Sequence, residues 1–364
     1  MSDGWINVGD AEREAAERLG PGPLGYFAGG AGDELTLAEN LEAWRRWRFR
    51  PRVLRDTSEV STEVELLGAP LSMPLLVAPV AYQRLAHPDG EIGMAGAAAA
   101  AGTVMCLSTL ATTRPSEVAA AVTAGRRWFQ LYQFRDEAIT RALVAEAIGA
   151  GFEAIVVTVD APPGGNRERD QRTGFEIPAE IGVPSVAAAL GSERAVTIKE
   201  TFELMTRAMG WSDFADLASE AAVPVLVKGI LTPDDAVLAV EHGAAAVIVS
   251  NHGGRQLDRA PATADVLAEI VDAVDGRIPV LVDGGIRRGI DIAIALALGA
   301  DAVLVGRPAL WGLAAGGESG AARVLALLRA ELELTLALCG CTSPAELSRS
   351  HVQRAPATSV YSRQ

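Results

Sequence analysis

The chain has 364 residues, of which 49% are hydrophobic and 21% are charged. This length and composition support a large buried core, and they exclude an intrinsically disordered chain and a small disulfide-stabilised scaffold. The net charge of −14, from 32 basic and 46 acidic residues, argues against nucleic acid or an anionic membrane as a partner.

The N-terminal segment, residues 1–70, is expected to be helical and to precede the repeating part of the fold. Residues 10–19 predict a short helix that ends at the breaker Pro21-Gly22-Pro23, and residues 33–44 predict a second helix. The N-terminus has no apolar signal-peptide core, and no apolar run in the chain reaches the ~18 residues that a membrane-spanning helix needs. We therefore expect no membrane partner.

Short apolar, β-branched runs then alternate with alanine-rich helical stretches. The runs predict eight strands, at 75–78, 104–107, 128–131, 154–157, 225–227, 246–249, 280–282 and 302–305. Helices are predicted at 90–100, 116–123, 136–150, 233–242, 263–274, 289–298 and 321–338. Eight β–α cycles predict an α/β fold, the (β/α)8 TIM barrel. An open doubly wound sheet is the alternative, but Pro79-Val80-Ala81-Tyr82 stands where its Gly-rich turn would follow the first strand.

The connection between the fourth and fifth predicted strands is far longer than one crossover helix requires. This insertion, residues 161–222, contains Gly164-Gly165, Pro178 and a weakly apolar stretch at 183–190. We expect it to form a mobile lid over the barrel mouth, within a single barrel domain that spans 1–364. Anchoring to a membrane is disfavoured because the apolar stretch is not basic.

A polar group follows nearly every predicted strand, at the end that carries the active site of a TIM barrel. In chain order these strand ends are Pro79-Val80-Ala81, Ser108, Gln130 with Tyr132, Thr158 with Asp160, Lys228, Ser250-Asn251-His252, Asp283-Gly284-Gly285 and Gly306-Arg307. Solvated loop tips do not explain polar groups in register on so many strands. We therefore expect a functional mouth at this end of the barrel.

The turns after the last two strands predict a phosphate site. Gly284-Gly285-Ile286-Arg287 follows the seventh strand, and Gly306-Arg307 follows the eighth. Glycines let backbone N–H groups approach an anion, and the arginines add charge-assisted donors. Two ordinary turns do not require arginine at both places. The pattern fits a phosphorylated substrate as well as a phosphorylated cofactor.

Two strand-end residues suggest the chemistry. Lys228, one of only two lysines in the chain, lies in an apolar strand, where it suits contact with an anionic ring or a Schiff base. His252 follows the sixth strand, and Arg255, three residues later, has the donors to grip a carboxylate. Asp160 can orient the imidazole and stabilise its cationic form. A base beside a carboxylate clamp suits proton abstraction next to that carboxylate.

The sequence predicts no metal site. The other histidines, His87, His242 and His351, are scattered, and Cys339-Gly340-Cys341 lacks a second pair of ligands. With Cys106 the chain has three cysteines, which form no disulfide framework. A reducing, cytoplasmic location is therefore expected.

Residues 250–258, Ser-Asn-His-Gly-Gly-Arg-Gln-Leu-Asp, resemble the signature of the FMN-dependent 2-hydroxy acid oxidases and dehydrogenases. That family includes glycolate oxidase, lactate oxidase and the mandelate and hydroxymandelate oxidases. Further matches follow the family's order at 26–31, 86–91, 128–132, 158–160, 227–229 and 283–289. The resemblance therefore covers almost the whole chain.

The resemblance implies that FMN lies across the barrel mouth and that the substrate is a small 2-hydroxy acid. The implied cofactor-binding residues are Pro79, Val80, Ala81, Ser108, Gln130, Thr158, Lys228, Ser250, Asp283, Gly284, Gly285, Arg287, Gly306 and Arg307. The implied catalytic residues are His252, Asp160, Tyr132 and Arg255, and the implied substrate-binding residues are Tyr26, Tyr132, Arg167, His252 and Arg255. In this reading His252 is the base, and Arg255 and Arg167 hold the carboxylate.

Departures from the family pattern bear on the substrate. Asn166-Arg167 stands where the family often has two arginines, so only Arg167 is assigned. Leu110 stands where short-chain oxidases often have an aromatic residue, which leaves more room. Residues 78–85 resemble the hydroxymandelate oxidases most, although Tyr26 is less typical of them. We therefore expect oxidation of an (S)-2-hydroxy acid with a medium-sized or aromatic substituent, with O2 reduced to H2O2.

Three other functions share parts of this pattern. A dehydrogenase would pass the electrons to a quinone or a carrier protein; the lack of a preceding haem domain and of a strong membrane segment favours the oxidase. An FMN-dependent isomerase on the same barrel would not need His252 and Arg255 together. A binding protein that retains FMN without turnover would not need Asp160 or Arg167. The resemblance also implies a homo-oligomer, either a tetramer or an octamer.

Overall fold

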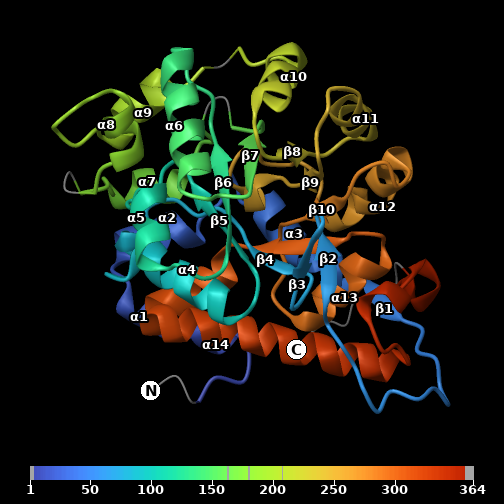
Figure 1. Ribbon diagram of the computed structural model, residues 1–364. Helices are drawn as coiled ribbons and strands as arrows, with labels where there is room; N and C mark the ends of the chain where they lie inside the picture. The colour runs from blue at the N-terminus through green and yellow to red at the C-terminus, as the bar shows by residue number, and fades with distance from the viewer. Residues whose placement is uncertain (1–3, 162–163, 179–180, 207, 357–364) are drawn as a thin grey trace.

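Figure 1 shows the computed structural model, which describes residues 4–161, 164–178, 181–206 and 208–356. Eight parallel strands close into a barrel in chain order, so the predicted TIM barrel is confirmed. The strands are β4 (Leu75–Val77), β5 (Val104–Ser108), β6 (Arg126–Leu131), β7 (Ala154–Thr158), β8 (Val225–Ile230), β9 (Val247–Val249), β10 (Val280–Val282) and β11 (Ala302–Val305). Hydrogen bonds between β11 and β4 complete the ring.

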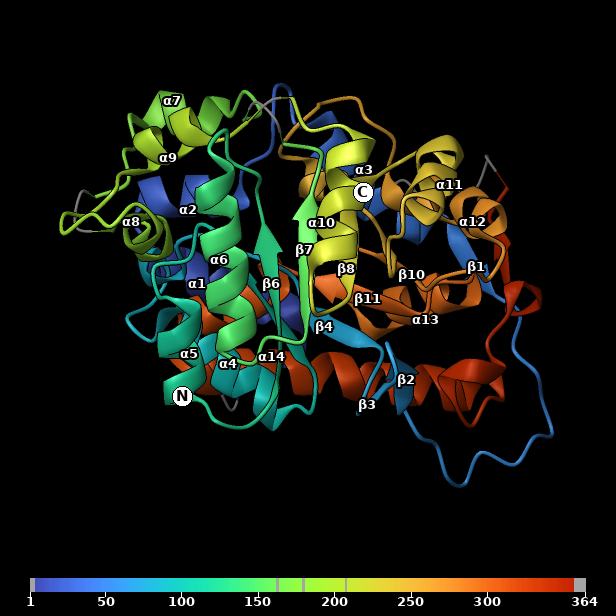
Figure 2. The same cartoon turned by 45° about the horizontal axis from the view of Figure 1, so that its top comes forward.

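Helices surround the barrel. They are α4 (Gly90–Ala100), α5 (Pro115–Ala121), α6 (Glu137–Gly149), α10 (Trp211–Glu220), α11 (Pro233–Glu241), α12 (Thr263–Val274), α13 (Gly289–Ala297) and α14 (Arg307–Cys339). Three more precede the barrel: α1 (Val8–Arg18), α2 (Pro21–Ala28) and α3 (Leu35–Arg45). In both views α14 runs along the lower edge, and the insertion helices α7 (Glu168–Thr173), α8 (Pro184–Ala189) and α9 (Ile198–Leu204) lie at the upper left (Figure 1, Figure 2).

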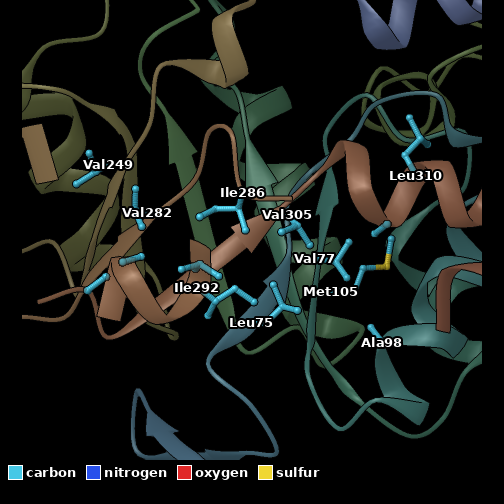
Figure 3. Packing of buried hydrophobic residues seen from close by; sticks show 14 of the residues in the cluster. Leu75, Val77, Ala98, Met105, Val249, Val282, Ile286, Ile292, Val305 and Leu310 are labelled. Atoms are coloured by element: carbon cyan, nitrogen blue, oxygen red, sulfur yellow. The ribbon is translucent and has the colours of Figure 1, made fainter. Parts of the chain in front are cut away.

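Alternate side chains of the strands form two layers of core. Inside the barrel Trp128 and Leu226 pack with small and branched residues from the other strands, and Leu66 and Leu71 of the hairpin β2 (Val64–Leu66) and β3 (Ala69–Leu71) join this cluster. The intervening positions point outward against the helices, as Leu75 does (Figure 3). Because the period of a strand is two, one face of each strand fills the barrel and the other supports the helical layer.

Several helix predictions were wrong or incomplete. The helix predicted at 10–19 is α1, which ends at Arg18 before Pro21 as expected. Pro21-Gly22-Pro23 also begins α2, which was missed; proline tolerates the first helical position, where its missing N–H has no partner to lose. The last helix starts at Arg307 and not at 321. It is kinked at Gly316 and Gly317, which have non-helical dihedral angles, and the part before this kink was not predicted. The helices of the insertion were also missed. Its residues 162–163, 179–180 and 207 lie outside the described chain.

Short strands at the chain ends were not foreseen either. β1 (Trp47–Phe49) pairs antiparallel with β12 (Val352–Arg354), and this pair joins the segment after α3 to the C-terminal end of the described chain. Among the described residues, no helix combines the length and the apolarity that a bilayer crossing requires.

Candidate active site

The site forms where the inward-facing positions of the strands change from apolar to polar. Along the interior face Cys106, Trp128, Val156, Leu226, Ile248 and Leu281 fill the barrel. Two residues further along the same strands come Ser108, Gln130, Thr158, Lys228, Ser250 and Asp283, all buried. Residues two apart in a strand share a face, so these six polar side chains converge at the carboxyl end of the barrel.

Lys228 is a fixed buried cation at the centre of this ring. Its Nζ lies 2.8 Å from Ser250 Oγ and 3.1 Å from Asp283 Oδ2. Burial acts to lower the pKa of Lys228, but the carboxylates of Asp283 and Asp160 outweigh it and raise the pKa above its ordinary value. The ammonium group is therefore charged at neutral pH, which excludes it as a free amine for a Schiff base.

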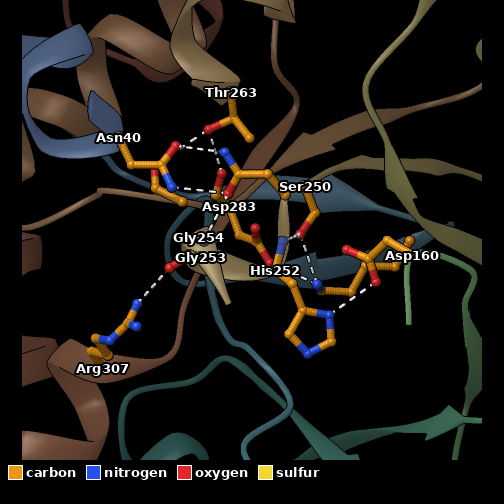
Figure 4. A network of polar contacts seen from close by, with 12 residues as sticks. Asn40, Asp160, Ser250, His252, Gly253, Gly254, Thr263, Asp283 and Arg307 are labelled. Carbon is orange, nitrogen blue, oxygen red and sulfur yellow. Dashed lines mark hydrogen bonds and ion pairs between the residues drawn. The ribbon is translucent and has the colours of Figure 1, made fainter. Parts of the chain in front are cut away.

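His252 forms a pair with Asp160 next to this ring (Figure 4). Its Nδ1 lies 2.9 Å from Asp160 Oδ1, and its backbone N–H donates to Ser250 Oγ. Burial acts to raise the pKa of Asp160, but His252 and Lys228 outweigh it and lower the pKa below its ordinary value. The ionised carboxylate fixes Nδ1 as the donor, so Nε2 is left as the proton acceptor. In the described part of the chain Nε2 has no hydrogen-bond partner.

Two arginines flank one tyrosine on the side of the insertion. The guanidinium carbons of Arg255 and Arg167 lie 5.0 and 5.4 Å from the ring centroid of Tyr26. Burial and the neighbouring Arg167 lower the pKa of Arg255 to about 10, so its guanidinium remains charged at neutral pH. Burial raises the pKa of Tyr132, whose phenol therefore stays protonated. Two like charges beside the protonated phenol of Tyr132 favour a bound anion.

A second group of arginines lies at the turns after β10 and β11. Burial lowers the pKa of Arg287, and burial together with Arg255 and Arg287 lowers that of Arg307. Arg307 is not a free ligand in this arrangement: Nε, Nη1 and Nη2 donate to the carbonyl groups of Phe27, Gly253 and Gly29. It therefore offers the mouth a positive charge while it fastens α2 to the short turn His252–Gly254, which we call the histidine turn.

One cavity is lined by nearly all the residues that the sequence singles out. They are Tyr26, Pro79, Val80, Ala81, Ser108, Gln130, Tyr132, Thr158, Arg167, Lys228, His252, Arg255, Asp283, Gly284, Gly285, Arg287, Gly306 and Arg307. The two exceptions are Asp160 and Ser250, which stand behind the wall and contact His252 and Lys228. The structure thus gathers the predicted set, with these two as supporting residues.

Residues that sequence reasoning did not select hold the walls in place. The side-chain amides of Asn40 and Asn251 donate to each other's oxygens at 2.8 Å, which joins α3 to the histidine turn (Figure 4). The carboxylate of Asp258 accepts the backbone N–H groups of Asp33 and Thr36. Asn251 and Asp258 lie within the motif at 250–258 and were detectable; Asn40, one of several polar residues in α3, had no signal.

Glu91 was also missed. Its buried carboxylate accepts the backbone N–H groups of Gln83 and Thr112 and the hydroxyl groups of Thr112 and Thr113. It therefore clamps the loop after β4 to the loop after β5, which carry Ala81 and Leu110 of the cavity wall.

Close packing at Gly285 provides a stability prediction. Gly285 has φ of +83°, and a Cβ atom there would lie 2.0 Å from the carbonyl oxygen of Asn40 in α3. We expect Gly285→Ala to lower the free energy of unfolding of the apo-protein by at least about 2 kcal/mol. Gly276, with φ of +68° and open space around it, is the matched control; Gly276→Ala should cost only about 1 kcal/mol of backbone strain. Chemical unfolding measures both, and equal losses would contradict the clash.

The cavity has the polar groups that a flavin mononucleotide requires. Gln130 Nε2, Thr158 Oγ1 and Asp283 Oδ1 are buried without a hydrogen-bond partner in the described chain. Buried polar atoms without a hydrogen-bond partner destabilise a protein, so these three atoms indicate a ligand with a polar edge. Arg287, the charge of Arg307 and the glycine turns fit an anion at the other end.

Comparison with known proteins decides which ligand this is. The family model described as FMN-dependent dehydrogenase matches residues 15–354. The chain belongs to this family. Its cofactor is therefore FMN, and the donor set described above fits that group.

Relatives from this family are similar over nearly the full length. The L-lactate oxidase of Nostoc sp. is 46% identical over 95% of this chain and 97% of its own. The glycolate oxidase of Spinacia oleracea is 46% identical over 95% of each chain. A crystal structure of mandelate oxidase with (S)-4-hydroxymandelic acid has a TM-score of 0.91 at 42% identity, and the match covers 96% of this chain and 99% of the other. The protein is thus an FMN-dependent enzyme of 2-hydroxy acid oxidation.

Proposed function

We propose that this enzyme oxidises an (S)-2-hydroxy acid with a medium-sized or aromatic substituent to the 2-oxo acid and reduces O2 to H2O2. The observation that carries the proposal is the position of two groups on one cavity. The His252 imidazole, paired with Asp160, and the Arg255 and Arg167 guanidinium groups share a wall with the residues that fit the flavin.

Bound FMN supplies the acceptor for the two electrons that leave C2 of the substrate. Its ring would be held by the backbone at 79–81 and by Ser108, Gln130, Thr158, Lys228 and Ser250. Its ribityl phosphate would be held by Asp283, Gly284, Gly285, Arg287 and Gly306, with the positive charge of Arg307 beside them. The positive charge of Lys228 would stabilise electron density on the ring edge that it faces.

The protein's own residues bind the acid and move its proton. Arg255 and Arg167 hold the carboxylate, with Tyr26 between them. Tyr132 donates its phenol proton to an oxygen of the substrate. His252 Nε2 accepts the proton that the substrate loses, and the adjacent Asp160 carboxylate stabilises the resulting imidazolium. The insertion contributes Arg167 and Phe202 to the wall, in keeping with a lid that excludes water during the reaction.

The size of the substituent is inferred from the apolar wall. Leu110, Gly164 and Phe202 also line the cavity. A glycine and a leucine leave space, and Phe202 offers a ring face for an aromatic or branched substituent.

Anaerobic mixing tests the reaction. Purified protein with FMN should lose its visible flavin absorbance when mixed with the S enantiomer of mandelate or 2-hydroxyhexanoate, and regain it on admission of air with one H2O2 per turnover. Bleaching without peroxide, with efficient reduction of a quinone or dye under nitrogen, would identify a dehydrogenase. Failure of every 2-hydroxy acid to bleach the flavin would refute the proposed function.

A variant of Asp160 tests its support of the base. Asp160→Asn removes the negative charge but keeps a side chain of the same shape, so the imidazolium loses its stabilisation. We expect the rate of flavin reduction to fall by about 10²–10⁴-fold with little change in substrate affinity. Stopped-flow absorbance separates rate from affinity. Because the pKa of Asp160 lies below its ordinary value, the wild-type rate should show no titration of this group above pH 5.

We also propose a cytoplasmic homo-oligomer, either a tetramer or an octamer. The three cysteines are buried free thiols, as expected in a reducing compartment. Leu334 and Leu338, 61% and 68% exposed, lie one turn apart on α14 and offer an apolar stripe to a second copy. Light scattering on the purified protein measures the assembly directly, and a monomer at micromolar concentration would contradict it.

A further inference from the structure

A second cavity lies beside the active site, beyond the ends of β6, β7 and β8. We infer that it receives the apolar end of an extended 2-hydroxy acid, so that the enzyme favours substrates with long substituents over short ones. This inference rests on the proposed function and deepens it by naming a subsite for the part of the substrate that does not react.

The two cavities share a thin wall. Tyr132, Thr158 and Ala161 line both of them. Ala161 contributes only a methyl side chain to the shared wall. A substituent that leaves C2 near His252 and passes Tyr132 therefore meets the second cavity next.

The second cavity suits an alkyl or aryl tail. Its volume is about 330 Å³, and its walls include Met205, Met209, Trp211, Phe214 and Ile230. A dry apolar cavity of about 150 Å³ can hold a benzene ring, so this one is large enough for several methylene groups or a ring. Methionine side chains adapt to irregular apolar ligands. Gln133, Thr206 and the acidic Asp235 also line the cavity, whereas no cation does so in the described part of the chain, which argues against a second carboxylate there.

The walls are held in place without a ligand. The backbone N–H of Thr206 donates to the carbonyl of Gln133 at 3.0 Å, and that of Arg135 donates to the carbonyl of Leu204 at 2.9 Å. These bonds fasten the segment between α9 and α10 to the loop after β6. The Trp211 and Phe214 rings pack edge to face with centroids 6.0 Å apart. A preformed pocket spares the ligand the cost of ordering it.

A chain-length series tests the inference on the wild-type holoenzyme. The substrates are straight-chain (S)-2-hydroxy acids from three to ten carbons. Once the tail passes Ala161, kcat/KM should rise by about fourfold per methylene, the factor for burial of one CH2 group, until the cavity is full. A flat or falling series from four to eight carbons would overturn the subsite. If short acids still bleach the flavin, the proposed function survives that result.

Substitution at Met209 locates the tail. Met209→Trp fills the cavity, and we expect KM for 2-hydroxyoctanoate to rise at least tenfold while kcat/KM for lactate changes less than twofold. Met209→Leu keeps an apolar side chain of similar volume and should behave like the wild type with both acids. An equal effect of Met209→Trp on both acids would contradict the assignment.

Fluorescence provides a readout that does not require turnover. Octanoate lacks the 2-hydroxyl group and cannot be oxidised, but its tail would contact Trp211 when the carboxylate sits at Arg255. Titration with octanoate should change the tryptophan emission of the wild type, and Trp211→Phe should abolish this change while octanoate still inhibits oxidation of lactate. An unchanged emission response in Trp211→Phe would place the tail elsewhere.

Discussion

Substitution of His252 by alanine should leave FMN bound and slow its reduction by 2-hydroxy acids by about 10⁴-fold, the upper range for loss of a general base. The residues that would hold the flavin lie on all eight barrel strands or in the turns after them, and the His252 imidazole is not among them. The proton-accepting Nε2 has no substitute, because Asp160 is committed to Nδ1 behind it. Stopped-flow measurement of flavin absorbance under nitrogen gives the rate.

The backbone at His252 determines the choice of control. Its φ of 58° lies in the left-handed region, where alanine is strained and asparagine is tolerated. His252→Asn therefore removes the base with less strain, and it should be as slow as the alanine variant. His242→Ala, at a histidine whose Nδ1 contacts the Leu238 carbonyl outside the cavity, should retain the wild-type rate. Normal bleaching by both variants of His252 would remove this residue from the mechanism.

The barrel and most of the site were predictable because one periodic rule governs both. Strands with inward apolar side chains at alternate positions end in a polar residue of the same face, as in Leu226 and Lys228. The carboxyl ends of parallel strands meet at one mouth. Prediction of the strands therefore also predicts which residues converge at the mouth, without knowledge of the loops.

What the sequence did not reveal depends on contacts between distant segments. Asn40 pairs with Asn251 across 211 residues, and no local pattern encodes that approach. The donors of Arg307 looked free for a phosphate, but they bind carbonyl groups of α2 and of the histidine turn, because the N-terminal segment packs over the barrel mouth. Glu91 lies in α4, whose alanine-rich pattern predicts a buried helix but not the contacts of this carboxylate. The second cavity arises from the insertion, whose helices carry weak periodicity.

The charges at the barrel mouth explain why Arg255 should matter most for the affinity for substrate. Lys228 is neutralised by Asp283, whereas Arg255 and Arg167 are two like charges beside one tyrosine. Burial and, after it, repulsion from Arg167 lower the pKa of Arg255. An anion between them relieves that repulsion, and a buried charge pair gains more than an exposed one because water screens it less. The carboxylate of the substrate is the group that completes this arrangement.

Arg255→Met should therefore weaken substrate binding by about 10²–10³-fold, within the range for truncation of a buried charge pair. The variant also loses the donors from Nη1 to the carbonyl groups of Tyr26 and Gly29, at 2.6 and 2.9 Å, so the end of α2 becomes less firmly held. Arg255→Lys restores the charge without the planar fork and should recover only part of the affinity.

Arg169→Met is the matched control, because Arg169 pairs with Glu34 at the surface near the same end of α2. An exposed pair contributes little, so this variant should bind substrate as the wild type does. Titration of each protein with a 2-hydroxy acid under nitrogen, followed by the rate of bleaching against concentration, gives the dissociation constant. If Arg255→Met kept the wild-type constant, the carboxylate would have to bind elsewhere, and the assignment of Arg255 as its anchor would fail.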